Sequence, residues 1–133
     1  MGKIMYMDEE YAGNGVDYVV DQGVSGIWTY RKWASGIAEC WGSLTWTITS
    51  WTAWSSWYYS TASPAASFPS GLFVSAPLMT TSGRTSNGDA GIYWRSSTAI
   101  SKDAVPTFGF MRPAAGTNNI TGYLYMHAIG SWK

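Results

Sequence analysis

Charged residues are scarce in this sequence, and neither sign predominates. They make up 12% of the 133 residues, and eight basic side chains balance eight acidic ones, which gives a formal net charge of zero. Sequence-independent binding to nucleic acid requires a positive field that such a chain does not generate, and anionic membrane surfaces attract proteins through the same field. We therefore expect neither nucleic acid nor membrane insertion among the interactions of this protein.

The sequence is also poor in cysteine, and it has no long apolar run. Cys40 is the only cysteine, so no intramolecular disulfide can form and the fold has to be stable without one. Near the start, Asp8, Glu9 and Glu10 lie where a secretory signal would be apolar. No uninterrupted apolar stretch reaches membrane-spanning length. These features predict synthesis in a reducing cytoplasm.

The residue types that usually carry catalysis are few. His127 is the only histidine, and it lies among tyrosines in an expected strand, so we interpret it as a hydrogen-bonded core or interface residue rather than a general base. Cys40 lies between Glu39 and Trp41, a setting typical of a small buried thiol. Neither residue has the neighbours of a metal site, so we expect no metal and no cofactor.

Glycoside hydrolysis would require two carboxylates that face one cleft about 5–9.5 Å apart, and the acidic residues do not indicate such a pair. We expect Glu39 to face Arg31 across a hairpin, whereas Asp89 and Asp103 follow short polar stretches typical of turns. Glycine-rich phosphate-binding motifs and a nucleophile elbow are absent as well. The sequence therefore predicts a protein that is not an enzyme.

Helical periodicity is missing too, and glycine and proline interrupt the chain so often that the windows between them suit short strands. The expected strands are rich in β-branched and aromatic residues, and they cover residues 18–20, 27–33, 37–48, 72–76, 92–95, 107–112 and 120–129. Their spacing is typical of a sandwich or a small barrel. We predict one all-β domain over residues 17–133, an antiparallel β-sandwich of short strands. Residues 1–16 are expected to be a connector from an upstream part of a longer protein.

The stretch GIWTYRKWASGIAECWG, residues 26–42, reads as a hairpin that carries three tryptophans. If residues 34–36 form a three-residue loop with Gly36 in the left-handed conformation, Arg31 lies opposite Glu39 and Thr29 lies opposite Trp41. Both faces of this hairpin then carry indole rings. A strand pair that is apolar on both sides is normally covered on both sides, by the opposite sheet and by another chain.

The last expected strand has the same property. Ile120, Leu124, Met126 and Ala128 fall on one parity, and Tyr123, Tyr125, His127 and Ile129 fall on the other. Because neither face is plainly polar, we expect a homo-oligomer formed through sheet faces, with edge-strand or loop contacts as the alternative.

The residues with the most evident binding chemistry lie in the aromatic stretch TWTITSWTAWSSWYYS, residues 45–60. A pyranose has an apolar C–H face that packs on an aromatic ring, while nearby hydroxyl groups bond to the sugar hydroxyls. We therefore list Trp51, Trp54, Trp57 and Tyr58 as candidate saccharide-binding residues. The alternative is that these rings plug the end of the sandwich or a groove between subunits.

A second candidate patch is the sequence GRTSNGD, residues 83–89, which we expect to form a loop. Arg84, Asn87 and Asp89 supply the charged and amide groups that commonly orient a bound ligand. The alternative is an ordinary solvated hairpin loop.

The residues described so far resemble a known family. DYVVDQGVSGIWTYRKWASGIAECWG, together with YLYMHAIGSWK at the end of the chain, is similar to the C-terminal domain of tail-fibre and minor structural proteins from phages and prophages of Gram-positive bacteria. The resemblance spans residues 17–133. It is most specific at residues 29–42 and 127–133, whereas residues 44–115 match only in their style of Ser/Thr-rich short strands.

The chain is more distantly similar to the H-type lectin-like domains at the tips of other phage fibres, which are trimeric antiparallel β-sandwiches that recognise host-surface glycans. This resemblance implies a non-catalytic, homotrimeric receptor-binding tip that attaches the virion to a bacterial surface saccharide. It also implies a virion protein that is made in the host cytoplasm and released by lysis. The alternative is a structural tip that trimerises or caps the fibre without touching the receptor.

Overall fold

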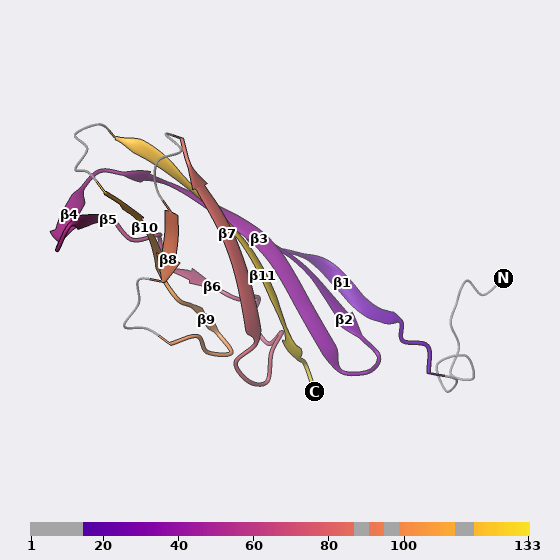
Figure 1. The fold of residues 1–133 in the computed structure, drawn as a ribbon. Coiled ribbons are helices and arrows are strands. Elements are labelled where there is room, and N and C mark those ends of the chain that lie inside the picture. The colour runs from indigo at the N-terminus through magenta and orange to yellow at the C-terminus, as the bar shows by residue number, and fades with distance from the viewer. Residues whose placement is uncertain (1–14, 87–90, 95–98, 114–118) are drawn as a thin grey trace.

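The structure is a computed structural model that describes residues 15–86, 91–94, 99–113 and 119–133. Over these residues it contains β-strands and no helix, and every strand pair is antiparallel. The fold class expected from the sequence, an all-β antiparallel arrangement of sandwich type, is therefore confirmed (Figure 1).

The larger sheet has five strands in the order β1-β2-β3-β11-β7. Its strands are β1 (Val19–Ser25), β2 (Trp28–Trp33), β3 (Ile37–Ile48), β11 (Ile120–Ser131) and β7 (Leu78–Thr85). A four-stranded sheet has the order β4-β5-β10-β8, with β4 (Trp51–Trp54), β5 (Trp57–Ser60), β10 (Phe108–Arg112) and β8 (Gly91–Trp94). The short strands β6 (Ala66–Ser67) and β9 (Ala104–Val105) pair with each other. Figure 1 shows β1 and β2 at one end of the molecule and the β4–β5 hairpin at the other.

The β2–β3 hairpin has the predicted register. Arg31 pairs with Glu39 and Thr29 pairs with Trp41. Gly36 has a φ of +101°, and its amide donates to the carbonyl oxygen of Trp33 at 2.9 Å. A left-handed residue at this position closes the turn at little steric cost only because it is glycine.

The β3–β11 pair forms the centre of the large sheet, and it is buried on one face only within this chain. On β11 the inward residues Leu124, Met126 and Ala128 are buried, while Tyr125 and Ile129 on the other parity are exposed. The inward face packs against the rest of the chain, where Trp46 of β3 stacks on Phe110 of β10 with ring centroids 5.6 Å apart. The predicted parity of this strand is confirmed.

The segment 72–76 is a correction, because it forms bends rather than the expected strand. Leu72 and Phe73 are nevertheless buried, and Phe73 makes an edge-to-face contact with Phe68, whose ring also meets that of Trp28. The segment therefore closes the core as a loop. Its apolar residues make that contact, and the segment pairs with no strand of the described structure.

Candidate functional site

The β4–β5 hairpin forms the end of the molecule that lies farthest from Gly15, the first described residue (Figure 1). Trp54 pairs with Trp57, and the two intervening residues make a tight turn in which Ser55 has a φ of +55°. The Trp54 side chain is 60% exposed and that of Trp57 is 48% exposed. Two adjacent indoles are thus held at the tip by backbone pairing.

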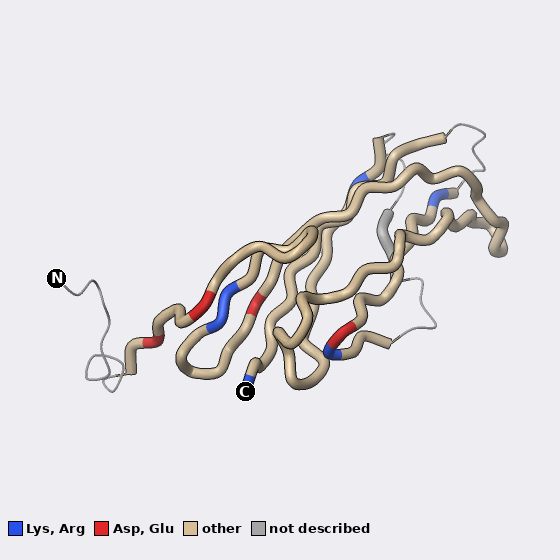
Figure 2. Tube along the Cα trace, turned by 180° about the vertical axis from the view of Figure 1, so that it is seen from behind, with Lys and Arg blue, Asp and Glu red and all other residues tan. Residues whose placement is uncertain are grey.

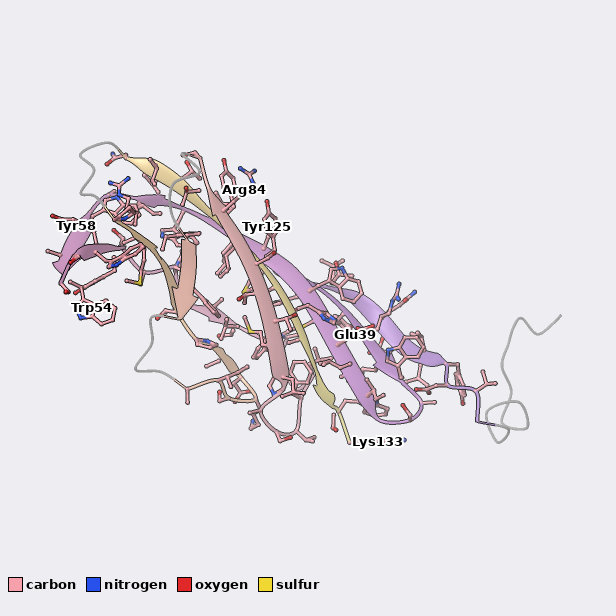
Figure 3. All side chains as sticks on the ribbon, in the orientation of Figure 1. Glu39, Trp54, Tyr58, Arg84, Tyr125 and Lys133 are labelled. Atoms are coloured by element: carbon pink, nitrogen blue, oxygen red, sulfur yellow. The ribbon has the colours of Figure 1, made fainter. Side chains whose placement is uncertain are left out.

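The four aromatic residues predicted from the sequence do not share one surface. Side chains alternate along a strand, and the register places Trp54 and Trp57 on one face of the hairpin and Trp51 and Tyr58 on the other. Figure 3 shows Tyr58 and Trp54 on opposite sides of it. The sequence indicated the segment that holds these four residues but could not divide them between its two faces.

Trp51 has a structural role in this arrangement. The guanidinium carbon of Arg112 lies 3.8 Å from the centroid of the Trp51 ring, and Arg112 pairs with Tyr58 across the β5–β10 ladder. A cation held over an indole in a partly buried site is a strong contact. Trp51 and Arg112 therefore anchor the hairpin to β10 and leave the Trp54–Trp57 face available for a ligand.

The Trp54–Trp57 face combines flat rings with hydroxyl groups and carries no charge. Thr52 lies on the same face, and Ser55 and Ser56 form the turn; all three residues are exposed. No residue of either hairpin strand is charged, and the charged residue nearest to them in the sheet ladder is Arg112 of β10 (Figure 2). This combination suits the apolar C–H face and the hydroxyl groups of a neutral sugar.

The second predicted patch differs from the expectation. Arg84 lies within strand β7 rather than in a loop, and its guanidinium carbon lies 3.9 Å from the centroid of the Tyr123 ring. It projects from the outward face of the large sheet on the same side as Tyr125 (Figure 3). Asn87 and Asp89 lie outside the described residues.

The part of the outward face that carries Arg84 and Tyr125 is rich in hydroxyl groups, and the sequence did not indicate this. Tyr125 pairs with Ser43 on one side and with Ser82 on the other. The parity of the last strand gave a signal for Tyr125, but the sequence gave none for β7, because Met79 is the one large apolar residue among its inward positions.

Arg31 and Glu39 face each other across the hairpin as predicted, but the Glu39 carboxylate contacts a different residue. Glu39 Oε2 instead lies 3.0 Å from His127 Nε2, and the Arg31 guanidinium carbon lies 5.4 Å from the centroid of the Trp41 ring. His127 reaches Glu39 diagonally across the β3–β11 ladder. The interpretation of His127 as a hydrogen-bonded residue is confirmed.

Cys40 and Asp103 are the remaining candidates for chemistry, and the contacts of both are structural. Cys40 is buried, and desolvation raises the pKa of its thiol to about 12, so it is held as a neutral core group. Asp103 accepts from Lys102 Nζ at 3.1 Å, and its amide donates to Ser101 Oγ at 3.2 Å, as expected for a turn residue. Among the described residues, no three His, Cys, Asp or Glu side chains are grouped to hold a metal ion.

Comparison with models of protein families, with curated proteins and with solved structures found no match for this chain. In the part of the chain that the structure describes, no helix has the length and apolarity needed to cross a bilayer.

Proposed function

We propose that this chain is the receptor-binding tip of a phage tail fibre, and that it binds a bacterial surface saccharide on the Trp54–Trp57 face without catalysis. The observation that carries the proposal is the exposed pair of adjacent indoles, surrounded by hydroxyl groups, at the end of the molecule farthest from Gly15. An incoming surface meets such a tip first. The resemblance to fibre C-terminal domains supports this assignment and its location in the virion.

The proposal includes a lectin-like homotrimer attached to upstream fibre domains. Its support within the chain is the outward face of the large sheet, where Tyr125, Ile129, Ile37 and Leu78 are exposed. Monomers rarely leave several large apolar side chains uncovered on one face. The same observation favours a second candidate function, a structural tip that trimerises the fibre while another domain binds the host.

Binding of host cell-wall polysaccharide to the intact protein tests the proposal. Trp54→Ala with Trp57→Ala should weaken binding at least tenfold, about 1.4 kcal/mol, while the oligomer and its thermal stability are kept because both side chains are exposed. Trp54→Tyr with Trp57→Tyr should keep much of the affinity, since it retains aromatic faces. Acrylamide quenching of tryptophan fluorescence should fall when polysaccharide is added.

Trp51→Ala is the contrasting variant. It removes the ring under Arg112, so it should lower thermal stability more than the double Trp54 and Trp57 variant does. Unchanged polysaccharide binding by the double variant would refute the saccharide site. If the double variant also dissociated into monomers, the rings would hold the tip together and the structural alternative would be correct.

A further inference from the structure

The outward face of the large sheet carries an apolar group of residues at the end opposite the aromatic hairpin. Leu78 is 78% exposed, and Ile37 and Ile129 are also exposed. Leu78 pairs with Ile129 across the β7–β11 ladder, and Ile129 pairs with Glu39 of β3. Adjacent exposed aliphatic side chains on a regular sheet mark a surface that another protein covers.

This surface has a projection and a hollow close together. A hollow of about 330 Å³ is lined by Trp33, Ile37 and Ile129 together with the carboxylate residues Asp17 and Glu39. Leu78 projects from β7, the strand at the edge of the sheet. An exposed leucine and a mostly apolar hollow that lie on one face of the same chain are complementary in shape and in polarity.

If another chain covered the hollow, both carboxylates that line it would still have hydrogen-bond partners. Asp17 Oδ1 accepts from the amides of Tyr18 at 2.9 Å and Ser35 at 3.0 Å. Glu39 Oε2 lies within hydrogen-bond distance of His127 Nε2. Burial of a polar group is costly mainly when it loses its hydrogen bonds, and these bonds are made within the chain.

The size and charge of the face fit a second copy of this chain. The four strands β2, β3, β11 and β7 together present roughly 600 Å² in projection, comparable to the ~800 Å² that each partner contributes to a stable interface. The chain has no net charge, so two copies meet without long-range repulsion. The apolar end of the face offers Arg31 as well as Glu39, which lets opposite charges meet across the contact.

We propose that Leu78 of one copy inserts into the hollow formed by Trp33, Ile37 and Ile129 of a neighbouring copy. The inference rests on the proposed homotrimer and specifies the contact that would build it. Around the three-fold axis of that trimer, the contact from Leu78 of one copy to the hollow of the next is heterologous, and its repetition closes into a ring.

Cysteine cross-linking between differently labelled copies tests this contact. Chains with Leu78→Cys and chains with Ile37→Cys are co-refolded and oxidised under mild conditions, so that only contacts between copies can link the two positions. We expect a covalent dimer in the mixture and none with either variant alone. The native Cys40 is buried and should stay reduced. The control mixture pairs Leu78→Cys with Val24→Cys, which is equally exposed at 76% but does not line the hollow, and it should not cross-link.

Sedimentation of Leu78→Asp supplies the second measurement. Its mass should fall to that of the monomer with the strand content unchanged, whereas Val24→Asp should keep the mass of the wild-type oligomer. Cross-linking of Leu78→Cys with itself, a Leu78→Asp variant that stays oligomeric, or a wild-type chain that is monomeric would each overturn the proposal. The first two results would still be compatible with a trimer formed through another contact. Saccharide binding through Trp54 and Trp57 is measured independently of all three.

Discussion

At the scale of single residues, Asp17 fixes the start of the described fold to the β2–β3 turn. Its carboxylate accepts from the amides of Tyr18 and Ser35 and from the Ser35 hydroxyl. These bonds, led by the one from the hydroxyl and assisted by the charge of Lys133, hold the pKa of Asp17 below its usual value near 3.8. A half-buried acidic residue thus joins segments that are far apart in the sequence.

The sign of this pKa shift predicts how the contribution of Asp17 depends on pH. A carboxyl group with a lowered pKa in the folded state stabilises the fold when it is ionised, and the contribution is lost as the pH falls below 3.8 through the folded pKa. Asp17→Asn should therefore have a lower melting temperature than the wild type near neutral pH, and the difference should shrink toward zero in acid. Differential scanning calorimetry from neutral pH to below 3.8 measures the melting temperatures of both proteins.

Asp21→Asn is the matched control, because Asp21 is exposed on β1 and makes no contact of this kind in the described structure. It should change the melting temperature little at either end of the range. A difference between Asp17→Asn and the wild type that is as large in acid as at neutral pH would contradict the role assigned to the Asp17 charge.

At the scale of elements, the entry into β2 depends on the absence of a side chain at residue 42. Gly42 pairs with Trp28 on one side and with Met126 on the other. A Cβ atom at this position would lie 2.5 Å from the carbonyl oxygen of Ile27 and 3.1 Å from the Trp28 ring. The close approach lets the Trp28 ring lie against Gly42 of β3, while its Nε1 donates to the carbonyl oxygen of Ser67 in β6 at 2.7 Å.

Gly42→Ala should therefore destabilise the fold. Overpacking of a tight site costs about 1–3 kcal/mol of unfolding free energy, and here the closest atom belongs to the backbone, which cannot rotate away. Equilibrium unfolding in urea measures the change. Ser43→Ala, at the next and exposed position of the same strand, should be nearly neutral; equal stabilities for the two variants would show that the backbone shifts at no cost.

The contrast between β3 and β7 shows how much of the fold could be predicted from sequence. Residues 37–48 were predicted as a strand with the bounds that β3 has, because the stretch is rich in β-branched and aromatic residues. β7 was missed, since its inward positions include Thr81 and Gly83, and its extended form comes from pairing with β11. A strand that owes its structure to a distant partner leaves little pattern of its own.

The candidate site was predictable to the level of the segment but not of the face. Alternating aromatic and hydroxyl residues marked the β4–β5 hairpin, yet only the turn at Ser55 and Ser56 decides that Trp54 lies opposite Trp57. A register shifted by one residue would have exchanged the two faces. The contact between Arg112 and Trp51 joins residues from separate strands, and no spacing in the sequence indicates it.

At the scale of the whole molecule, neutrality should govern how ligand binding responds to salt. The formal net charge is zero, and none of the residues of β4, β5 and their turn, which form the Trp54–Trp57 face, is charged. Binding of a neutral polysaccharide should therefore change less than about twofold between about 0.05 and 0.5 M salt, although the Debye length falls severalfold over that range. Isothermal titration calorimetry at several salt concentrations tests this, and a tenfold loss of affinity would show that charged groups contribute to binding.

The central pairing of β3 with β11 also constrains the order of events during synthesis. β11 lies between β3 and β7, and its residues 120–131 follow those of β3 by more than seventy positions. Until β11 leaves the ribosome, one edge of β3 and the edge of β7 that pairs with β11 have no partner. Folding of the large sheet must then wait for translation to pass residue 131, and because the closing loop is long the search for this pairing is slow. The nascent chain, rich in aromatic residues, is most exposed to aggregation and most in need of a chaperone during that interval.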